Sequence, residues 1–128
     1  KKHQLNNVEF AGRVKRKYIP SIMKLSSVLV TNYVQNDHLD LYIPGKLFEY
    51  AISEKPIVMG SKGDAKYFVE KYNLGIAVPP SDANSFKEAI IKVSTESYKY
   101  KPNTAQFTVD FSIQNVIKLY NRVFENLL

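Results

Sequence analysis

Residues 43–60 read IPGKLFEYAISEKPIVMG, and this pattern indicates a helix followed directly by a buried strand. A Pro-Gly pair opens the stretch, and proline is favoured at the first position of a helix. The short apolar run after Lys-Pro is typical of a strand inside a sheet. The stretch therefore predicts a helix over 44–54 and a strand over 56–60.

The same alternation continues on both sides of this stretch. Further strands are predicted over 7–12, 27–33 and 75–80, and further helices over 18–26, 64–73 and 81–97. Helices and strands that alternate every 10 to 15 residues are the signal for a parallel sheet with crossover helices. The expected fold class is therefore α/β, a Rossmann-like open parallel sheet with helices on both faces.

A length of 128 residues fits a single domain. The β-α repeats occupy residues 6–95, a looser connecting stretch follows over 96–111, and a terminal helix is predicted over 112–128. One wide apolar stripe runs along that helix, formed by Ile113, Val116, Ile117, Tyr120, Val123, Phe124 and Leu127. We expect this helix either to close the domain or to reach onto a neighbour.

The charge balance favours anionic partners, because the chain carries a formal net charge of +6. The densest basic run is RVKRK at residues 13–17, and the alternative to a binding role is a solvated loop. The chain has no cysteine, which excludes a disulfide framework and a thiolate metal site and is compatible with a reducing cytoplasm. No apolar stretch approaches the roughly 20 residues that a membrane-spanning helix needs.

In open parallel sheets, ligands bind beyond the carboxyl ends of the strands. The long connection over 32–43 leads from one such end to the helix that begins near Pro44. The first amides of that helix, those of Gly45, Lys46 and Leu47, carry the positive end of the helix dipole. This helix start is a candidate anion site, most naturally for phosphate.

Glu49 lies roughly 5 to 8 Å beyond that phosphate site, at about 1.5 Å per helical residue. This is about the offset from a diphosphate to the ribose hydroxyls of a nucleotide, and a carboxylate can accept two hydrogen bonds from a vicinal diol. Two apolar pairs bury the helix and leave Glu49 and Ser53 on another face: Leu47 with Ala51, and Phe48 with Ile52. The alternative is an exposed glutamate favourable near a helix start.

The order of four motifs resembles the pattern of a known enzyme family: FAGRV, PGKLFEY, KPIV and GIAVPP. Residues 6–95 resemble the carboxyl-terminal lobe of retaining, nucleotide-sugar-dependent glycosyltransferases of the GT-B fold, family 4. The similarity is greatest to members that build surface polysaccharides such as O-antigen and capsule. The resemblance implies a transferase that moves a sugar, with retention, from a nucleotide-sugar to a glycan or lipid-linked acceptor.

The resemblance also implies site residues. Glu49 matches the family glutamate that holds the donor ribose, and Gly45, Lys46 and Leu47 match the helix start that meets the donor phosphates. The helix start and the ribose residue therefore receive the same roles from the resemblance as from the spacing.

The base of the donor would lie against the strand end formed by Gly12, Arg13 and Val14. The implied donor is a UDP-sugar, and departure of UDP is helped by positive charge and backbone amides rather than by a required metal. The two histidines, His3 and His38, have no metal-ligand spacing, in agreement with an enzyme that needs no cofactor.

The chain departs from the family pattern at one donor-sugar position. Many members carry a glutamate eight positions before the ribose glutamate, where this chain has Leu41. Contacts to the donor sugar must then come from elsewhere in the loop. The candidates are Asp37, His38 and Asp40, with solvated loop residues as the alternative.

The family pattern also has more chain before residue 1, namely a β-α-β segment that clamps the diphosphate and an acceptor-binding domain. We therefore expect the chain to be an incomplete lobe that is inactive alone. The expected location is cytoplasmic, with Lys15, Arg16 and Lys17 as candidates for contact with the anionic inner face of a membrane.

Two other functions stay open. A UDP-sugar epimerase of the same fold would need a carboxylate and histidine set, of which this chain offers His38 alone. A noncatalytic basic module would use the run at 13–17 and the tyrosines to bind nucleic acid or membrane. The preferred interpretation, a glycosyltransferase, includes no nucleic-acid partner.

Overall fold

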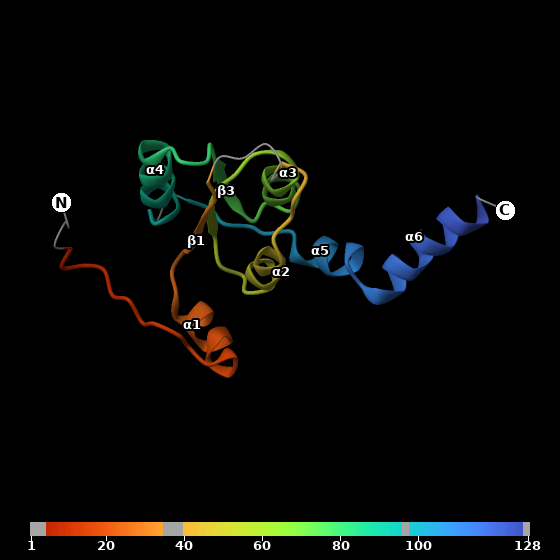
Figure 1. The fold of residues 1–128 in the computed structure, drawn as a ribbon, viewed down its shortest axis with the longest axis horizontal. Helices are drawn as coiled ribbons and strands as arrows, with labels where there is room; N and C mark the ends of the chain where they lie inside the picture. Colours follow the sequence, from red (N-terminus) through yellow and green to blue (C-terminus); the bar gives the residue numbers. More distant parts are fainter. Residues whose placement is uncertain (1–4, 35–39, 96–97, 127–128) are drawn as a thin grey trace.

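The computed structural model describes residues 5–34, 40–95 and 98–126. Its sheet has three parallel strands in the order β1-β2-β3: β1 (Leu29–Asn32), β2 (Ile57–Gly60) and β3 (Gly75–Val78). Each strand pairs in register with the next, Leu29 opposite Ile57 and Ile57 opposite Gly75. The predicted parallel sheet is confirmed for these three strands (Figure 1).

Six α-helices and one short 3₁₀ helix lie in the described part of the chain. They are η1 (Arg16–Tyr18), α1 (Ile19–Leu25), α2 (Gly45–Ala51), α3 (Gly63–Lys71), α4 (Ala83–Val93), α5 (Thr104–Asp110) and α6 (Ile113–Glu125). Three of the helices have side-chain N-caps, because the side chains of Asp82, Asn103 and Ser112 accept from backbone amides of the first turn.

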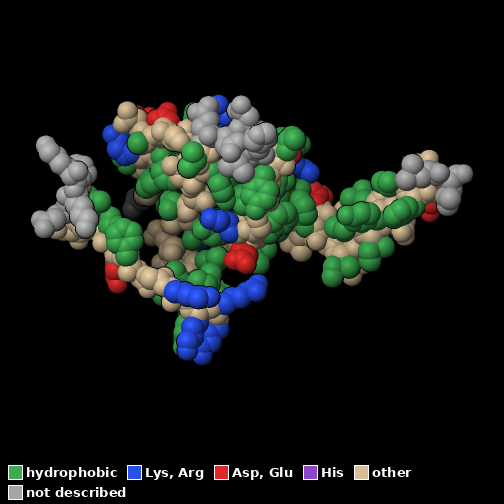
Figure 2. Space-filling view, in the orientation of Figure 1, with side chains coloured by type: hydrophobic (Ala, Val, Ile, Leu, Met, Phe, Trp, Pro, Cys, Tyr) green, Lys and Arg blue, Asp and Glu red, His purple; other side chains and the backbone are tan. Residues whose placement is uncertain are grey.

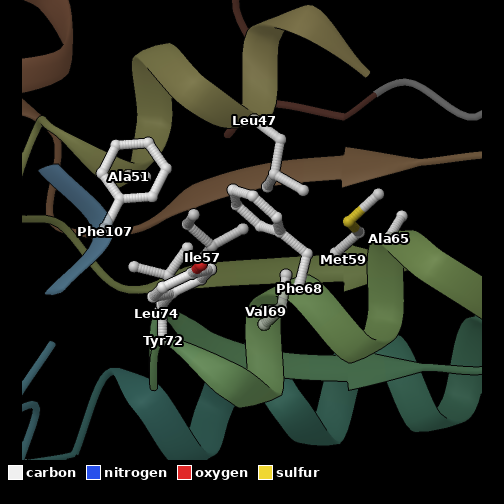
Figure 3. Close-up of a cluster of buried hydrophobic side chains, with 10 residues drawn as sticks. All are labelled: Leu47, Ala51, Ile57, Met59, Ala65, Phe68, Val69, Tyr72, Leu74 and Phe107. Atoms are coloured by element: carbon white, nitrogen blue, oxygen red, sulfur yellow. The ribbon is translucent and has the colours of Figure 1, made fainter. Parts of the chain in front are cut away.

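Helices cover both faces of the sheet because the central strand is buried on both sides. Val58 packs with Ala89 and Val93 of α4 on one face. On the other face lies the larger cluster, drawn in Figure 3, which α2, α3, α5 and β2 build together. Its buried members are Leu47, Ala51, Ile57, Met59, Ala65, Phe68, Val69, Tyr72, Leu74 and Phe107. The predicted open α/β fold, with helices on both faces, is confirmed.

Aromatic rings join α2, α3 and α5 within this cluster. The Phe68 ring lies 5.3 Å from Phe48, 5.2 Å from Tyr72, 5.7 Å from Phe107 and 5.5 Å from Phe111, centroid to centroid. Such tilted and edge-on pairs contribute about 0.5–1.5 kcal/mol each beyond their buried area. Phe68 is therefore the centre of the packing that holds the three helices together.

The connecting stretch contains a helix, α5, that the sequence pattern missed. Its N-cap is Asn103, whose own amide donates a 2.8 Å hydrogen bond to the Tyr72 carbonyl. Upstream, the Tyr100 hydroxyl donates 3.0 Å to the carbonyl of Lys55, and burial raises the pKa of that hydroxyl to about 12. The stretch is thus bonded to the residues that follow α3 and to those that precede β2.

The predicted strand over 7–12 is wrong. These residues form no strand and lie along an extended segment away from the sheet (Figure 1), and Phe10 is 93% exposed. A strand requires a neighbour for its backbone groups. Residues 7–12 have the apolar alternation of a strand, but no described strand pairs with them.

Helix α6 confirms the helical part of the prediction for the terminal segment. It extends from α5 away from the sheet (Figure 1), and none of its residues is buried. Apolar side chains follow it in Figure 2, and Ile113, Tyr120 and Phe124 are each more than half exposed. In the described chain, α6 therefore does not cover the core.

Candidate functional site

The carboxyl ends of the three strands lie side by side at the same end of the sheet. Hydrogen bonding continues past their ends, from the Tyr33 amide to Gly60 and from the Ser61 amide to Val78, each at 3.0 Å. The Asn32 side chain lies over Gly60, where any Cβ would collide with it. A residue with a side chain is therefore excluded at position 60 while Asn32 stays in place.

The start of α2 is open around Gly45, the first residue of the helix. A Cβ at Gly45 would meet no atom within 4 Å, although the next turn of the helix is packed. Pro44 is the N-cap, with φ −65° and ψ 136°, and not the first helical residue as predicted. The Leu47 amide donates 2.9 Å to the Pro44 carbonyl, and its side chain is fully buried. Of the three phosphate candidates, Gly45 and Lys46 are exposed.

Lys46 lies beside the end of β1. Its Nζ is 5.6 Å from the centre of the Tyr33 ring, within cation–π distance. The Tyr33 hydroxyl is buried and has no hydrogen-bond partner among the described residues. This contact places a positive charge between the start of α2 and the carboxyl end of β1.

Glu49 faces away from the core, as the pattern predicted. Its side chain is 53% exposed, and Oε1 lies 4.0 Å from Nη2 of Arg16, which is 96% exposed. The predicted burial of Ile52 is wrong, because this side chain is 65% exposed. Phe48, its expected partner, turns instead into the aromatic cluster with Phe68. Ile52 is thereby left on the same side of α2 as Glu49.

A groove of about 680 Å³ lies between α1 and α2, a volume suited to a small ligand. Its apolar lining consists of Ile19, Pro20, Met23 and Ile52. Its polar lining consists of Arg16, Lys24, Glu49, Ser53, Glu54 and Lys55. Figure 2 shows Lys and Arg side chains gathered on the lower side of the molecule, where Figure 1 places α1. The groove thus combines an apolar floor with charged groups of both signs.

The basic run is only partly a loop. Gly12 turns the chain with φ +65°, in the left-handed region that favours glycine, and Arg13 is exposed. Residues 16–18 then form η1, where Lys17 lies 4.9 Å from the Tyr18 ring centre. The base candidates Gly12, Arg13 and Val14 are not among the residues that line the groove. Arg16 does line the groove. The sequence indicated it only as a candidate for membrane contact, because the fold alone brings it close to Glu49.

The loop before α2 is described in part. The donor-sugar candidates Asp37 and His38 lie outside the described residues. The third candidate, Asp40, accepts a 2.7 Å hydrogen bond at its carbonyl from the amide of Asp64. Leu41 is exposed beside it. The start of α3 therefore anchors the end of the loop next to the start of α2.

A second polar cluster joins α3 to α5. The Tyr72 hydroxyl donates 2.6 Å to Oδ2 of Asp110, and Lys71 lies 3.2 Å from the same oxygen. The hydrogen bond from Tyr72 holds the pKa of Asp110 below its usual range. Hydrogen bonds to Tyr72 and Asp110 raise the pKa of Lys71 to about 12. None of these residues lines the groove, so the cluster stabilises the fold.

Two kinds of feature, a membrane-spanning helix and a metal-ligand group, are absent from the described residues. No described helix combines the length and the apolar character needed to cross a bilayer. Within the same described ranges, no three His, Cys, Asp or Glu side chains are grouped to hold a metal ion.

Comparison with known proteins identifies a family. Residues 1–96, three quarters of the chain, match the family described as glycosyl transferases group 1. No curated protein and no solved structure matches the chain. The matched range contains the sheet, the start of α2, Glu49 and the whole groove. The chain therefore belongs to the group 1 glycosyl transferases.

Proposed function

We propose that the chain binds the donor of a retaining GT-B glycosyltransferase of family 4, one that transfers a sugar from a UDP-sugar to a glycan or lipid-linked acceptor. The observation that carries this proposal is the position of Glu49. Its half-exposed carboxylate lines a groove, about one helical turn after a glycine with open space around it. Group 1 membership supports glycosyl transfer in general.

In this proposal Glu49 accepts hydrogen bonds from the two ribose hydroxyls. The diphosphate lies at the start of α2, against the backbone at Gly45 and the charge of Lys46. Because Leu47 is buried and its amide is bonded to Pro44, its contribution is to hold the helix start in place. The proposed contacts to the donor sugar stay those expected from the sequence, Asp37, His38 and Asp40, of which Asp40 lies within the described residues.

The chemistry expected of these residues is electrostatic. A leaving nucleoside diphosphate gains negative charge as the bond to the sugar breaks. Lys46 and the amides at the helix start stabilise that charge, and this requires no proton transfer. We propose that the reaction needs no metal.

Calorimetric titration of UDP into the full-length protein tests this proposal, with ADP and GDP as competing nucleotides. We expect selective UDP binding that Glu49→Ala abolishes or reduces more than tenfold, because two hydrogen bonds to a charged group are lost. Glu54→Gln is the matched control, since Glu54 lines the same groove. Equal losses in both variants, or UDP binding indifferent to Glu49, would contradict the ribose assignment. Salt-dependent nucleic-acid binding without nucleotide binding would support the noncatalytic module.

We also propose that Lys15 and Lys17 contact an anionic membrane, since both are exposed beside the groove residue Arg16. The double variant Lys15→Glu with Lys17→Glu should lose co-sedimentation with anionic vesicles and keep UDP affinity. Unchanged co-sedimentation would remove the membrane from the proposal and leave the donor site untouched.

A further inference from the structure

We infer that Tyr33 is a positioning residue for the transfer reaction, whose ring holds the ammonium group of Lys46 in the place where it meets the donor diphosphate. The inference rests on the proposed function, which assigns the diphosphate to Lys46. Tyr33 touches no ligand itself and acts through the lysine. The contact that carries the inference is the 5.6 Å between Nζ of Lys46 and the centre of the Tyr33 ring.

The fold fixes the Tyr33 ring. The Tyr33 amide, directly after β1, donates a 3.0 Å hydrogen bond to the carbonyl of Gly60. The side chain is half-buried and packs against the larger cluster, and its hydroxyl oxygen is buried. Lys46 is exposed on α2, and the four-carbon stem of a lysine is flexible. Because the ring already restricts this stem, less ordering is needed when a ligand binds.

The contact between Tyr33 and Lys46 joins two elements of the fold. Each of the two other described lysines that lie over a tyrosine ring belongs to a pair of consecutive residues, at 17–18 and 71–72. Contact between consecutive residues requires no particular fold. Lys46, however, lies 13 positions after Tyr33 in the chain. This pair forms because the fold brings the carboxyl end of β1 to α2.

An aromatic ring holds a lysine without neutralising it. The electron-rich face of the ring attracts the ammonium group, and the lysine keeps its full positive charge. Among the described residues, Lys46 takes part in none of the ion pairs. A carboxylate partner would cancel its charge and compete with an incoming phosphate. Tyr33 thus orients the ammonium group and leaves it available to an anion.

The hydroxyl group of Tyr33 is not needed for this role. It is buried and has no hydrogen-bond partner among the described residues. Loss of a buried hydroxyl that has no partner removes no interaction. Tyr33→Phe keeps the ring face that contacts Lys46, so it should bind the donor nucleotide as the wild type does.

The experiment titrates UDP and uridine, which lacks phosphate, into the full-length protein, by competition where binding is weak. Lys46→Met should weaken UDP roughly tenfold or more, because a charged contact is lost. Tyr33→Leu should weaken UDP about threefold to tenfold, the effect of losing one cation–π contact. Neither variant should change uridine affinity. In Lys46→Met, the addition of Tyr33→Leu should have no further effect, because the two residues act as one unit.

Two further variants separate the cation–π contact from packing. Tyr50→Leu is the matched control, because Tyr50 also packs against the larger cluster and no described lysine or arginine lies over its ring. It should leave UDP affinity unchanged. A trifluorinated phenylalanine at position 33 keeps the shape of the ring and loses its negative face. It should bind UDP about threefold less tightly than Tyr33→Phe.

Three results would overturn the inference alone. They are equal UDP affinities of Tyr33→Phe and the trifluorinated variant, a loss in Tyr33→Phe as large as in Tyr33→Leu, and a further loss when Tyr33→Leu is added to Lys46→Met. Wild-type UDP affinity in Lys46→Met, or absence of UDP binding in the wild type, would overturn the proposed function and the inference with it.

Discussion

The backbone amide of Asp64 donates a 2.7 Å hydrogen bond to the carbonyl oxygen of Asp40, which joins the start of α3 to the loop that leads into α2. The first residue of α3, Gly63, makes this approach possible. Gly63 has φ +58°, and a Cβ there would collide with the backbone of Asp40. The position of the α2 start thus depends on a glycine in another helix.

Replacing Gly63 by alanine should destabilise the fold. The left-handed φ and the collision with Asp40 add up to roughly 2–4 kcal/mol of unfolding free energy. Urea denaturation measures this change. The matched control is Gly45→Ala, where a Cβ meets no atom within 4 Å. It should change the stability by less than about 0.5 kcal/mol. Equal stability of the two variants would refute this role of Gly63.

Gly45→Ala should nevertheless weaken donor binding. The protein itself leaves room for a side chain at this position, so a requirement for glycine would come from a ligand. In the proposed function, the donor diphosphate occupies that room and approaches the backbone closely. We expect a several-fold loss of UDP affinity by calorimetry, with an unchanged urea midpoint. Wild-type affinity in this variant would place the diphosphate elsewhere.

The sequence predicted strands β2 and β3 well because their signals are local. Residues 56–60 and 75–80 are short apolar runs between turn residues, and each contains a strand of the sheet, β2 and β3. The segment at 7–12 has the same signal and forms no strand. Alternation shows only that a segment can pair, whereas pairing requires a partner at the right edge. The missed helix α5 depends on contacts with Tyr72 and the aromatic cluster, which no local pattern contains.

The site was predicted less completely than the fold. The spacing from Pro44 placed Glu49 on the open face of its helix, because helical geometry is local. The proximity of Arg16 was not predictable, since it lies 33 positions before Glu49 in the chain. The exposure of Ile52 was missed for a related reason. The four-residue spacing that pairs it with Phe48 did not show that the aromatic ring alone enters the core.

Substitution of a core phenylalanine should lower the unfolding free energy much more than substitution of an exposed phenylalanine. Phe68→Ala removes the ring that touches four other aromatic side chains, and we expect a loss of about 3–5 kcal/mol of unfolding free energy. Phe124→Ala changes a residue of α6 that is 61% exposed, and should cost less than about 0.5 kcal/mol. Both values come from urea denaturation of the full-length protein. A large loss for Phe124→Ala would show that α6 is packed against a surface outside the described chain.

Stability should fall at alkaline pH because of Tyr100. Burial raises the pKa of its hydroxyl to about 12 from an ordinary value of 10.0, so the folded state holds the proton more tightly than the unfolded chain. This contribution is fully present below pH 10 and is lost as the pH rises toward 12. Tyr100→Phe removes the group and should flatten the fall between these limits, at the cost of the hydrogen bond to Lys55. Urea denaturation at several pH values measures the slope, and Tyr120→Phe, an exposed ring on α6, is the matched control. An unchanged alkaline slope in Tyr100→Phe would mean that this hydroxyl ionises equally in both states, and that the connecting stretch does not bury it.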